Sequence, residues 1–159
     1  MKKNVLLVPL TMNMYDASGV CNDLIYNIDL DQLLASPTGT PDYAEPDDIE
    51  SVDFAIDGTV VDWATINSCF RKSEKTNVNI TLTFTGKRNT TDPAQIAIAA
   101  TAFLTGSRCR TTVQITDNQS AISITVPVVI NVTSYAGGNG DDISGFAFEA
   151  KLNGEPTIA

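Results

Sequence analysis

The sequence predicts a mainly β protein, a β-sandwich or open barrel of about seven or eight strands with one flanking α-helix near residues 93–105. Two observations predict this class. Short segments in which apolar and polar residues alternate recur after residue 48, and turn signals separate them. Helix signals agree with one another only in the segment 87–106. We therefore expect a sheet with a single helix lying across one face or edge.

The helix is predicted from its two ends and its spacing. Asp92 stands at the N-cap position, and Pro93 follows at the first helical position, where its missing N–H has no cost. Gln95 lies three residues after the cap and can reach back to close a capping box. Gly106 offers a left-handed stop. Apolar residues recur at helical spacing: Ile96, Ala99, Ala100 and Phe103.

Two strand segments are predicted before the helix. In the first, Val52, Phe54 and Ile56 share one face, and Asp57-Gly58 predicts a tight turn into a second strand over residues 59–63. In the next segment the apolar residues are Val78, Ile80, Leu82 and Phe84. They alternate with uncharged polar residues: Asn79, Thr81, Thr83 and Thr85. One face of this strand is therefore predicted to be core and the other to be polar.

Three more alternating segments follow the helix. The first covers residues 109–115, with Cys109, Thr111, Val113 and Ile115 on one face. A longer one covers residues 122–132 and contains Pro127, which cannot donate to a ladder, so this strand is predicted to be an edge strand, or to be bulged or split there. The last covers residues 145–152.

The chain of 159 residues is long enough for one domain, which we divide into an N-terminal arm with an acidic loop (1–48) and a β core (49–159). The run 5–10 is predicted to be a buried or subunit-pairing strand, and residues 24–34 a short helix or an extended segment. Residues 36–48 contain three prolines, a glycine and a cluster of acids, and they read as an extended loop. A loop this long is usually functional or ordered by a partner.

Charge is unevenly distributed along the chain. Residues 1–62 hold 12 acids and 2 bases, for a net charge of −10, whereas residues 63–159 hold 7 acids and 8 bases, for a net charge of +1; together they give the total of −9. Arg71, Lys72 and Lys75 form the densest basic patch, either a solvated connection or a contact with the acidic loop of an identical subunit. The candidate inter-subunit acids are Asp42, Glu45, Asp47 and Asp48.

Enzyme chemistry is hard to build from this composition. The chain has no histidine, which removes the usual general base and most zinc sites. No glycine loop with a lysine or helix start is present to hold phosphate. The three cysteines have no metal-ligand spacing and are expected to be small buried residues. We predict no catalytic residue, no cofactor and no metal site, and no run of about 18 apolar residues predicts a membrane anchor.

The second half of the chain resembles the tail tube proteins, also called major tail proteins, of long-tailed bacteriophages. The resemblance is carried by TTDPAQIAIAATAFLTGS, by RCRTTVQITDN and by VVINVTSYAGGNGDDISGFAFEAKLNGEPTIA, with the family-like positions at Asp92, Pro93, Gln95, Gly106, Ser134, Gly154, Pro156 and Thr157. It covers roughly residues 49–159, and the order of elements carries it rather than any single motif. The segment 71–77 lacks an expected second tryptophan, and the acidic N-terminal part is longer than the family's arm.

The resemblance implies a structural virion protein, assembled in the host cytoplasm, whose hexameric rings stack into the tail tube and conduct DNA during ejection. Partners would be identical subunits and other tail proteins, namely the tape measure, tail terminator and distal tail proteins. Asn79, Thr81, Thr83 and Thr85 would line the wet lumen, and an acidic excess would keep DNA from adhering to the wall. Two alternatives stay open: the tube of a contractile injection or secretion system, and a β-sandwich binding or adhesin module.

Overall fold

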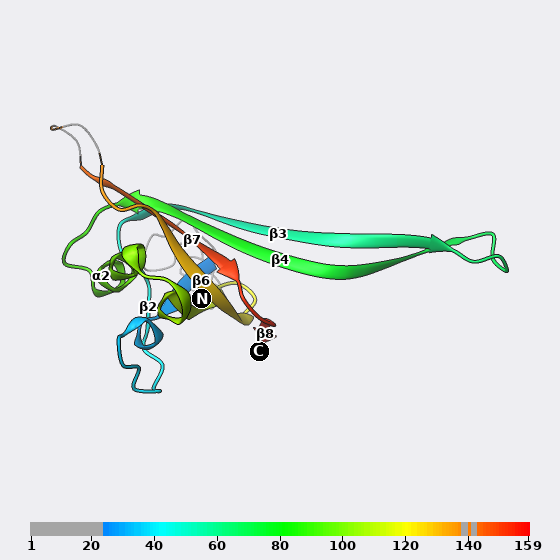
Figure 1. Ribbon diagram of the computed structural model, residues 1–159, viewed down its shortest axis with the longest axis horizontal. Coiled ribbons are helices and arrows are strands. Elements are labelled where there is room, and N and C mark those ends of the chain that lie inside the picture. The colour runs from blue at the N-terminus through cyan, green and yellow to red at the C-terminus, as the bar shows by residue number, and fades with distance from the viewer. Residues whose placement is uncertain (1–23, 138–139, 141–142) are drawn as a thin grey trace, which may run out of the picture.

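The computed structural model describes residues 24–137, 140 and 143–159 (Figure 1). Its strands are β1 (Leu24–Asp29), β2 (Tyr43–Ala44), β3 (Ile49–Ala64), β4 (Arg71–Lys87), β5 (Arg110–Asp117), β6 (Ser123–Ser134), β7 (Gly145–Leu152) and β8 (Thr157–Ile158). The α-helix of this described part is α2 (Pro93–Ala100), and 3₁₀ helices lie at Asp31–Leu33, Thr101–Phe103 and Gly106–Cys109. The strand predicted at 5–10 lies outside the described residues.

The strands of the described chain form one antiparallel sheet in the order β2-β1-β5-β6-β7-β4-β3, and β8 pairs with β6 beside this path. β1 and β4 are not neighbours in this order, yet the rings of Tyr26 and Phe84 meet edge to face with 5.6 Å between their centroids. The sheet is therefore strongly curled around its apolar face, and it stays open because β2 and β3 do not pair. The predicted fold class is confirmed, in its open-barrel form rather than as two stacked sheets.

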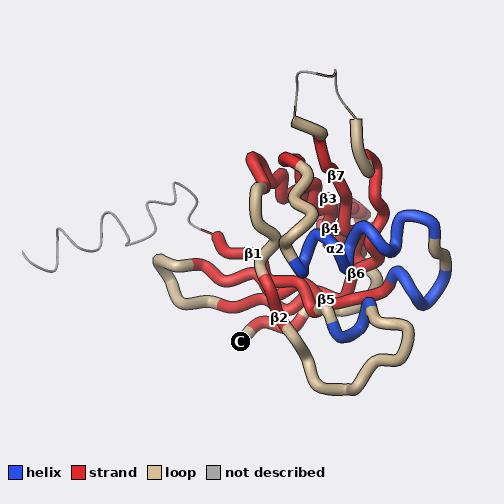
Figure 2. Tube along the Cα trace, turned by 90° about the vertical axis from the view of Figure 1, so that its left-hand side faces the viewer, coloured by secondary structure: helices blue, strands red, loops and turns tan. Residues whose placement is uncertain are grey.

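The core lies inside the curl, and α2 covers one end of it (Figure 2). Its largest fully buried apolar side chains come from β1, β4, α2, β5, β6 and β7: Ile28, Leu82, Phe84, Ile98, Val113, Ile115, Val126, Val128, Phe146 and Phe148. Phe84 and Phe148 stack with 4.5 Å between ring centroids, which joins β4 to β7 at the centre of the core. Alternation therefore places one face of each central strand in the core, as predicted.

The helix is shorter than predicted, and it turns a different face to the core. The chain leaves α-helical geometry after Ala100 and continues as the 3₁₀ turn Thr101–Phe103, in which the Thr101 hydroxyl donates to the Ile98 carbonyl at 2.7 Å. The buried residues of α2 are Ala94, Gln95, Ile98 and Ala99. Ile96 and Phe103, expected on the core face, are 49% and 84% exposed. Ala99 alone is common to the expected face and the buried one.

The helix start shows a second difference in detail. The Asp92 carboxylate accepts from the backbone N–H of Ala94 at 3.3 Å and of Gln95 at 3.1 Å, and Pro93 is the first helical residue. Gln95 does not close a capping box on Asp92. Instead Asn89 Oδ1 accepts from the Asp92 N–H at 3.2 Å. Gly106 has a positive φ of 69° but begins the 3₁₀ helix Gly106–Cys109, beyond the end of α2.

Part of the segment 1–48 belongs to the sheet and the core. β1 lies between β2 and β5, and Tyr26, Ile28, Leu30 and Leu33 are buried in the same core as the later strands. Of the two structures expected for residues 24–34, the extended one forms, followed by the 3₁₀ helix. The core therefore does not begin at residue 49, because alternation in LIYNID already places Tyr26 and Ile28 inward.

The acidic loop is held within its own chain. Asp29 Oδ1 accepts from Asp42 N at 2.9 Å, and Leu30 N donates to Asp42 O at 2.8 Å. Asp31 Oδ1 accepts from the Thr38 hydroxyl at 2.6 Å and its backbone N–H at 2.9 Å, while Oδ2 accepts from Gly39 N at 3.0 Å. These bonds, with β2 paired to β1, fix the loop without a neighbouring subunit.

The predicted turn at Asp57-Gly58 is wrong. β3 runs through it without interruption, Gly58 pairs with Val78 on β4, and the hairpin turns only at residues 65–70. The register shifts just after Gly58, between Thr59 and Val60. A Cβ at Gly58 would lie 2.5 Å from Lys75 Cε, so this glycine marks a close approach beside an irregularity within the strand.

Pro127 lies inside the sheet, so the edge-strand interpretation of residues 122–132 is wrong. β6 pairs with β5 on one side and with β7 and β8 on the other. The Pro127 carbonyl accepts from Asn153 N at 2.8 Å, and the N and O of one strand residue point to the same side. Pro127, which has no backbone N–H, therefore lies where the strand beside β6 changes from β7, which ends at Leu152, to β8. The strand is also neither split nor bulged at Pro127: β6 is continuous from Ser123 to Ser134, and its register shift against β7 lies between Val132 and Ser134.

Candidate functional site

The outer half of the β3–β4 hairpin, defined as Ile56–Ala64, the turn 65–70 and Arg71–Asn79, projects from the barrel (Figure 1). Every residue in its two strand segments is exposed. Alternation places Ile56 and Val60 on the same face as Val52 and Phe54, which pack against the core, yet Ile56 is 58% and Val60 59% exposed. The apolar stripe of β3 thus continues beyond the region that the described part of the chain covers.

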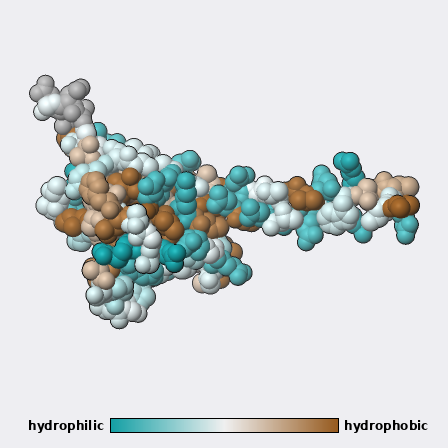
Figure 3. All heavy atoms as spheres, viewed as in Figure 1, coloured by the Kyte–Doolittle hydropathy of each residue, from teal (hydrophilic) through white to brown (hydrophobic). Residues whose placement is uncertain are grey.

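The end of the hairpin presents apolar side chains held by a compact turn. Ile66 is fully exposed, and Phe70 is 80% exposed. Ser68 N donates to Thr65 O at 3.1 Å, and the Ser68 hydroxyl accepts from Phe70 N at 3.2 Å. Cys69 is exposed in the same turn, which corrects the expectation of buried cysteines, whereas Cys109 is buried. Figure 3 shows hydrophobic patches along the projecting hairpin and at its end.

The predicted basic patch lies beside this turn. Arg71 pairs with Ala64, Lys72 with Trp63 and Lys75 with Val60, and all three basic side chains are exposed. Among the described residues the three basic side chains form no ion pair; the one in this part of the chain joins Lys151 Nζ to Glu149 Oε1 at 3.4 Å. Because successive strand residues face opposite sides, Arg71 and Lys75 share one face of this projecting element and Lys72 lies on the other.

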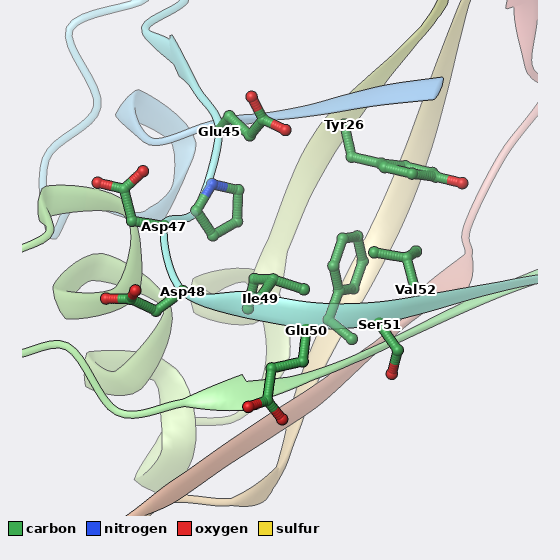
Figure 4. Close-up of a pocket in the computed structure, with 10 residues that line it drawn as sticks. Tyr26, Glu45, Asp47, Asp48, Ile49, Glu50, Ser51 and Val52 are labelled. Carbon is green, nitrogen blue, oxygen red and sulfur yellow. The ribbon is translucent and has the colours of Figure 1, made fainter. Parts of the chain in front are cut away.

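A pocket of about 620 Å³ lies at the base of the hairpin, where the loop after β2 meets the start of β3 (Figure 4). The acidic segment from Glu45 to Glu50 lines one side of it, and Figure 4 shows Tyr26 and Val52 across from Asp47 and Asp48. The residues that line it are Tyr26, Glu45, Pro46, Asp47, Asp48, Ile49, Glu50, Ser51, Val52 and Phe84. It is a depression at the open seam of the barrel, with an apolar floor and an acidic rim.

Gln95 and Asp92 fasten the rim of this pocket to the helix. Gln95 is completely buried; its Nε2 donates to the carbonyls of Asp47 at 2.6 Å and Lys87 at 2.9 Å, and its Oε1 accepts from Asn89 N at 2.8 Å. The Asp92 carboxylate accepts from Asp47 N at 3.0 Å. Asp92 and Gln95 therefore join the helix start to the loop at Asp47 and to the segment 87–89, and they hold the acidic rim in place.

The four predicted acids divide between two surfaces. Glu45, Asp47 and Asp48 line the seam pocket, and burial together with the charge of Asp47 raises the pKa of Glu45. Asp48 also accepts from Asn89 Nδ2 at 2.7 Å. Asp42 lies elsewhere, in a groove of about 560 Å³ beside α2 that is lined largely by apolar side chains such as Leu33.

The predicted polar face of β4 lies opposite the core. Thr81 and Thr83 are half-buried between neighbouring strands, while Asn79 and Thr85 are exposed. Across this face the β3 partners are Asp57, Ala55, Asp53 and Ser51, and the β7 partners are Lys151, Glu149 and Ala147. The four uncharged residues therefore lie in a band with carboxylates on both flanking strands.

The described residues contain no group of three or more His, Cys, Asp or Glu placed to hold a metal ion. In the same part of the chain, no helix is long and apolar enough to cross a membrane. The features that the fold presents to its surroundings are instead the projecting hairpin, the seam pocket and the polar face.

The amino-acid sequence matches neither a family model nor a curated relative. The fold matches a chain of the C6-symmetric tail of an empty gene transfer agent particle, with a TM-score of 0.64 and 13% identity over 88% of this chain and 98% of that one. The chain has the fold of a tail component. A chain in the virion of the native gene transfer agent particle matches with a TM-score of 0.63 and 10% identity over the same shares.

A further match comes from the sheath-tube complex of an extracellular contractile injection system, with a TM-score of 0.54 and 9% identity over 88% of this chain and 90% of that one. At these identities the likeness is one of fold. It confirms the resemblance to tail tube proteins at that level, and it covers a larger share of the chain than the segment 49–159 that carries the resemblance in the sequence.

Sequence reasoning missed the length of the hairpin and the seam pocket. The hairpin was hidden because Asp57-Gly58 is a strong turn signal and because Arg71–Asn77 contains no apolar residue to mark a strand. A glycine followed at once by Thr59, Val60 and Val61, residues that favour strands, was the available signal for a continuous strand. The pocket had no signal in the sequence, since it joins β1 to residues 45–52 only through the curl of the sheet.

Proposed function

We propose that this chain is the structural subunit of a tail tube, in which six-membered rings stack around a channel that conducts genomic DNA. The observation that carries the proposal is the outer half of the hairpin. Its apolar residues Ile56, Val60 and Val78 are 58%, 59% and 42% exposed, on a strand pair that no other described part of the chain covers. Exposed apolar surface of this kind marks an association site, and the match to a C6-symmetric tail supports a ring.

The polar face supplies the wall of the channel in this proposal. Asn79, Thr81, Thr83 and Thr85 carry no charge, and β3 adds Asp53 and Asp57 beside them. Uncharged hydroxyl and amide groups hydrate the surface, while carboxylates repel phosphate and prevent DNA from adhering. The chain's net charge of −9 acts in the same direction. In this proposal the role of the chain is structural, and it includes no catalytic step.

The remaining parts of the proposal concern partners. Hairpins and rims of identical subunits form the contacts between copies, with Asp42, Glu45, Asp47 and Asp48 facing basic residues of neighbours. The tube's ends bind other tail proteins of the tape measure, terminator and distal tail classes. Subunits assemble in the host cytoplasm and function in the virion tail.

Negative-stain electron microscopy of the purified protein at low and high concentration tests the proposal. Rings or tubes with an open axial channel are expected, and their abundance rises with concentration. The variant Ile56→Ser/Val60→Ser is expected to keep the fold and to lose the assemblies, because both residues are exposed in one chain. A protein that stays a monodisperse monomer over the whole range contradicts the proposal.

A second candidate is the tube of a contractile injection system, favoured by the match to an injection-system sheath-tube complex. The fold and the stacking would be the same, and the cargo would differ. Particles purified from the native source separate the two: nuclease-protected DNA inside particles supports the tail tube, and a contractile sheath without DNA supports the injection tube.

A further inference from the structure

The hairpin end combines an apolar anchor with positive charge. Phe70 is 80% exposed, and its backbone is held by the Ser68 hydroxyl, so the ring is presented by an ordered turn. Arg71 and Lys72 follow directly in the sequence and have no described acidic partner. An exposed aromatic residue flanked by cations is a composition typical of interface anchors.

The seam pocket offers the complementary surface. Its floor includes the rings of Tyr26 and Phe84 and the side chain of Val52, and its rim carries Glu45 and Asp47. Neither of these two carboxylates accepts a described hydrogen bond or ion pair. Its volume of about 620 Å³ is ample for one aromatic side chain.

The two surfaces cannot meet within one chain. Glu50 stands at the start of β3 and Ala64 at its end, next to the turn. Because a strand rises about 3.3 Å per residue, this stretch spans roughly 45 Å. Figure 1 shows the hairpin extending straight away from the barrel. Any contact between them is therefore made by two copies of the chain.

We propose that the hairpin end of one copy docks in the seam pocket of another, with Phe70 on the apolar floor and Arg71 and Lys72 facing Glu45 and Asp47. The inference rests on the proposed function, since it names the contact through which tube subunits join. The contact is heterologous: each copy gives a hairpin end and receives one, so it repeats from ring to ring. Opposite charges steer the encounter, and the buried ring supplies most of the affinity.

The first test compares two exposed phenylalanines. Phe70→Ser is expected to raise the critical concentration for assembly about tenfold or more, the effect of losing an interface anchor. Phe103→Ser removes an 84% exposed ring near α2 and is the matched control, with assembly as in the parent protein. Both should melt at the parental temperature. Parental assembly of Phe70→Ser overturns the inference.

A charge exchange tests the rim. Arg71→Glu/Lys72→Glu should block assembly, as should Glu45→Lys/Asp47→Lys. A chain carrying all four substitutions restores opposite charges across the contact and should assemble again. Asp48 is left unchanged because it is bonded to Asn89. Failure of the combined variant to assemble, with its melting temperature unchanged, overturns the pairing.

Cross-linking locates the contact directly. In a Cys21→Ser background, Glu45→Cys is expected to form disulfides with the exposed Cys69 of another copy when tubes are oxidised mildly, giving a ladder of covalent oligomers. Ser107→Cys, exposed in the 3₁₀ helix after α2, should give none. Tubes without the ladder overturn this inference and leave the proposed function standing, whereas a parent protein that never forms tubes overturns both.

Discussion

The inner and outer halves of the β3–β4 hairpin follow the same alternating pattern and have opposite environments. In the inner half, Leu82 and Phe84 are completely buried and Val52 packs against the core. In the outer half, Val60 and Val78 are 59% and 42% exposed. The strand pattern therefore does not end where the core ends.

The difference shows that alternation indicates which face of a strand is to be buried. It does not indicate whether the same chain or another molecule buries that face. β4 pairs with β7 only from Thr81 to Lys87, so among the described residues the outer half has no second neighbouring strand and no opposing layer. An isolated two-stranded ribbon is marginal in water. The outer half is thus suited to pack against another subunit. Substitutions in the inner half should therefore lower the stability of a single chain, and substitutions in the outer half should not.

The largest expected effect is that of Phe84→Ala in the inner half. Phe84 stacks on Phe148 and meets Tyr26 edge to face, so truncation leaves a cavity where three strands converge. We expect a loss of about 3–5 kcal/mol in the free energy of unfolding, measured by urea denaturation. Phe70→Ala in the outer half is the control, with a change within about 0.5 kcal/mol. Equal losses would show that the hairpin end packs within its own chain.

A pair of glycines gives the next comparison. A Cβ at Gly86 would collide with the Asp48 carbonyl oxygen and lie 2.7 Å from Ile49 Cα, both backbone atoms. Gly86→Ala should therefore lose about 1–3 kcal/mol of unfolding free energy, as overpacking does. At Gly58 the nearest atom is Cε of the flexible Lys75 side chain, which can move away. Gly58→Ala should therefore change the free energy of unfolding by about 0.5 kcal/mol or less. Similar losses in the two variants would show that the Lys75 side chain cannot move.

The sequence was sufficient to predict the strands whose partners lie in the core. Alternation placed Ile80, Leu82 and Phe84 inward correctly, and Asp92-Pro93 marked the helix start. These features are local, because a side-chain period and a cap are read from adjacent residues.

The features that failed are those that depend on pieces distant in sequence. The role of Gln95 in joining Asp47 to Lys87 requires the loop to return beside the helix, which no local pattern shows. The position of Pro127 inside the sheet, rather than on an edge strand, depends on where the chain re-enters as β8 beside β6. The seam pocket likewise exists only because the sheet curls until Tyr26 reaches Phe84.

Substitution of the helix cap is expected to have an intermediate effect on the free energy of unfolding. Asp92→Ala removes the acceptor of Ala94 N, Gln95 N and Asp47 N, and we expect a loss of about 1–2 kcal/mol in the free energy of unfolding. Asp62→Ala removes a carboxylate from the outer half and should change it by about 0.5 kcal/mol or less. Because Asp92 also holds the rim, hydrogen exchange at Asp47 N should quicken in Asp92→Ala alone. Unaltered exchange there would show that the rim is held without the cap.

The smallest effect concerns pH and the acidic loop beside the barrel. Hydrogen bonds from the Thr38 hydroxyl, then from the Thr38 and Gly39 backbone, hold the pKa of Asp31 below its usual 3.8, against the opposing effect of burial. A carboxyl whose pKa is lower in the folded state stabilises the fold fully above its unfolded pKa, and this contribution is lost as pH falls through the folded value. Asp31→Asn should therefore be less stable than the parent protein at pH 6, and the difference should shrink as pH falls below about 4. Asp53→Asn, which removes a carboxylate from the polar face of β3, controls for the general loss of one negative charge. A difference for Asp31→Asn that stays constant from pH 6 to pH 3 would mean that the asparagine disturbs the loop by shape alone, and the bonds to Thr38 and Gly39 would then not depend on the charge of Asp31.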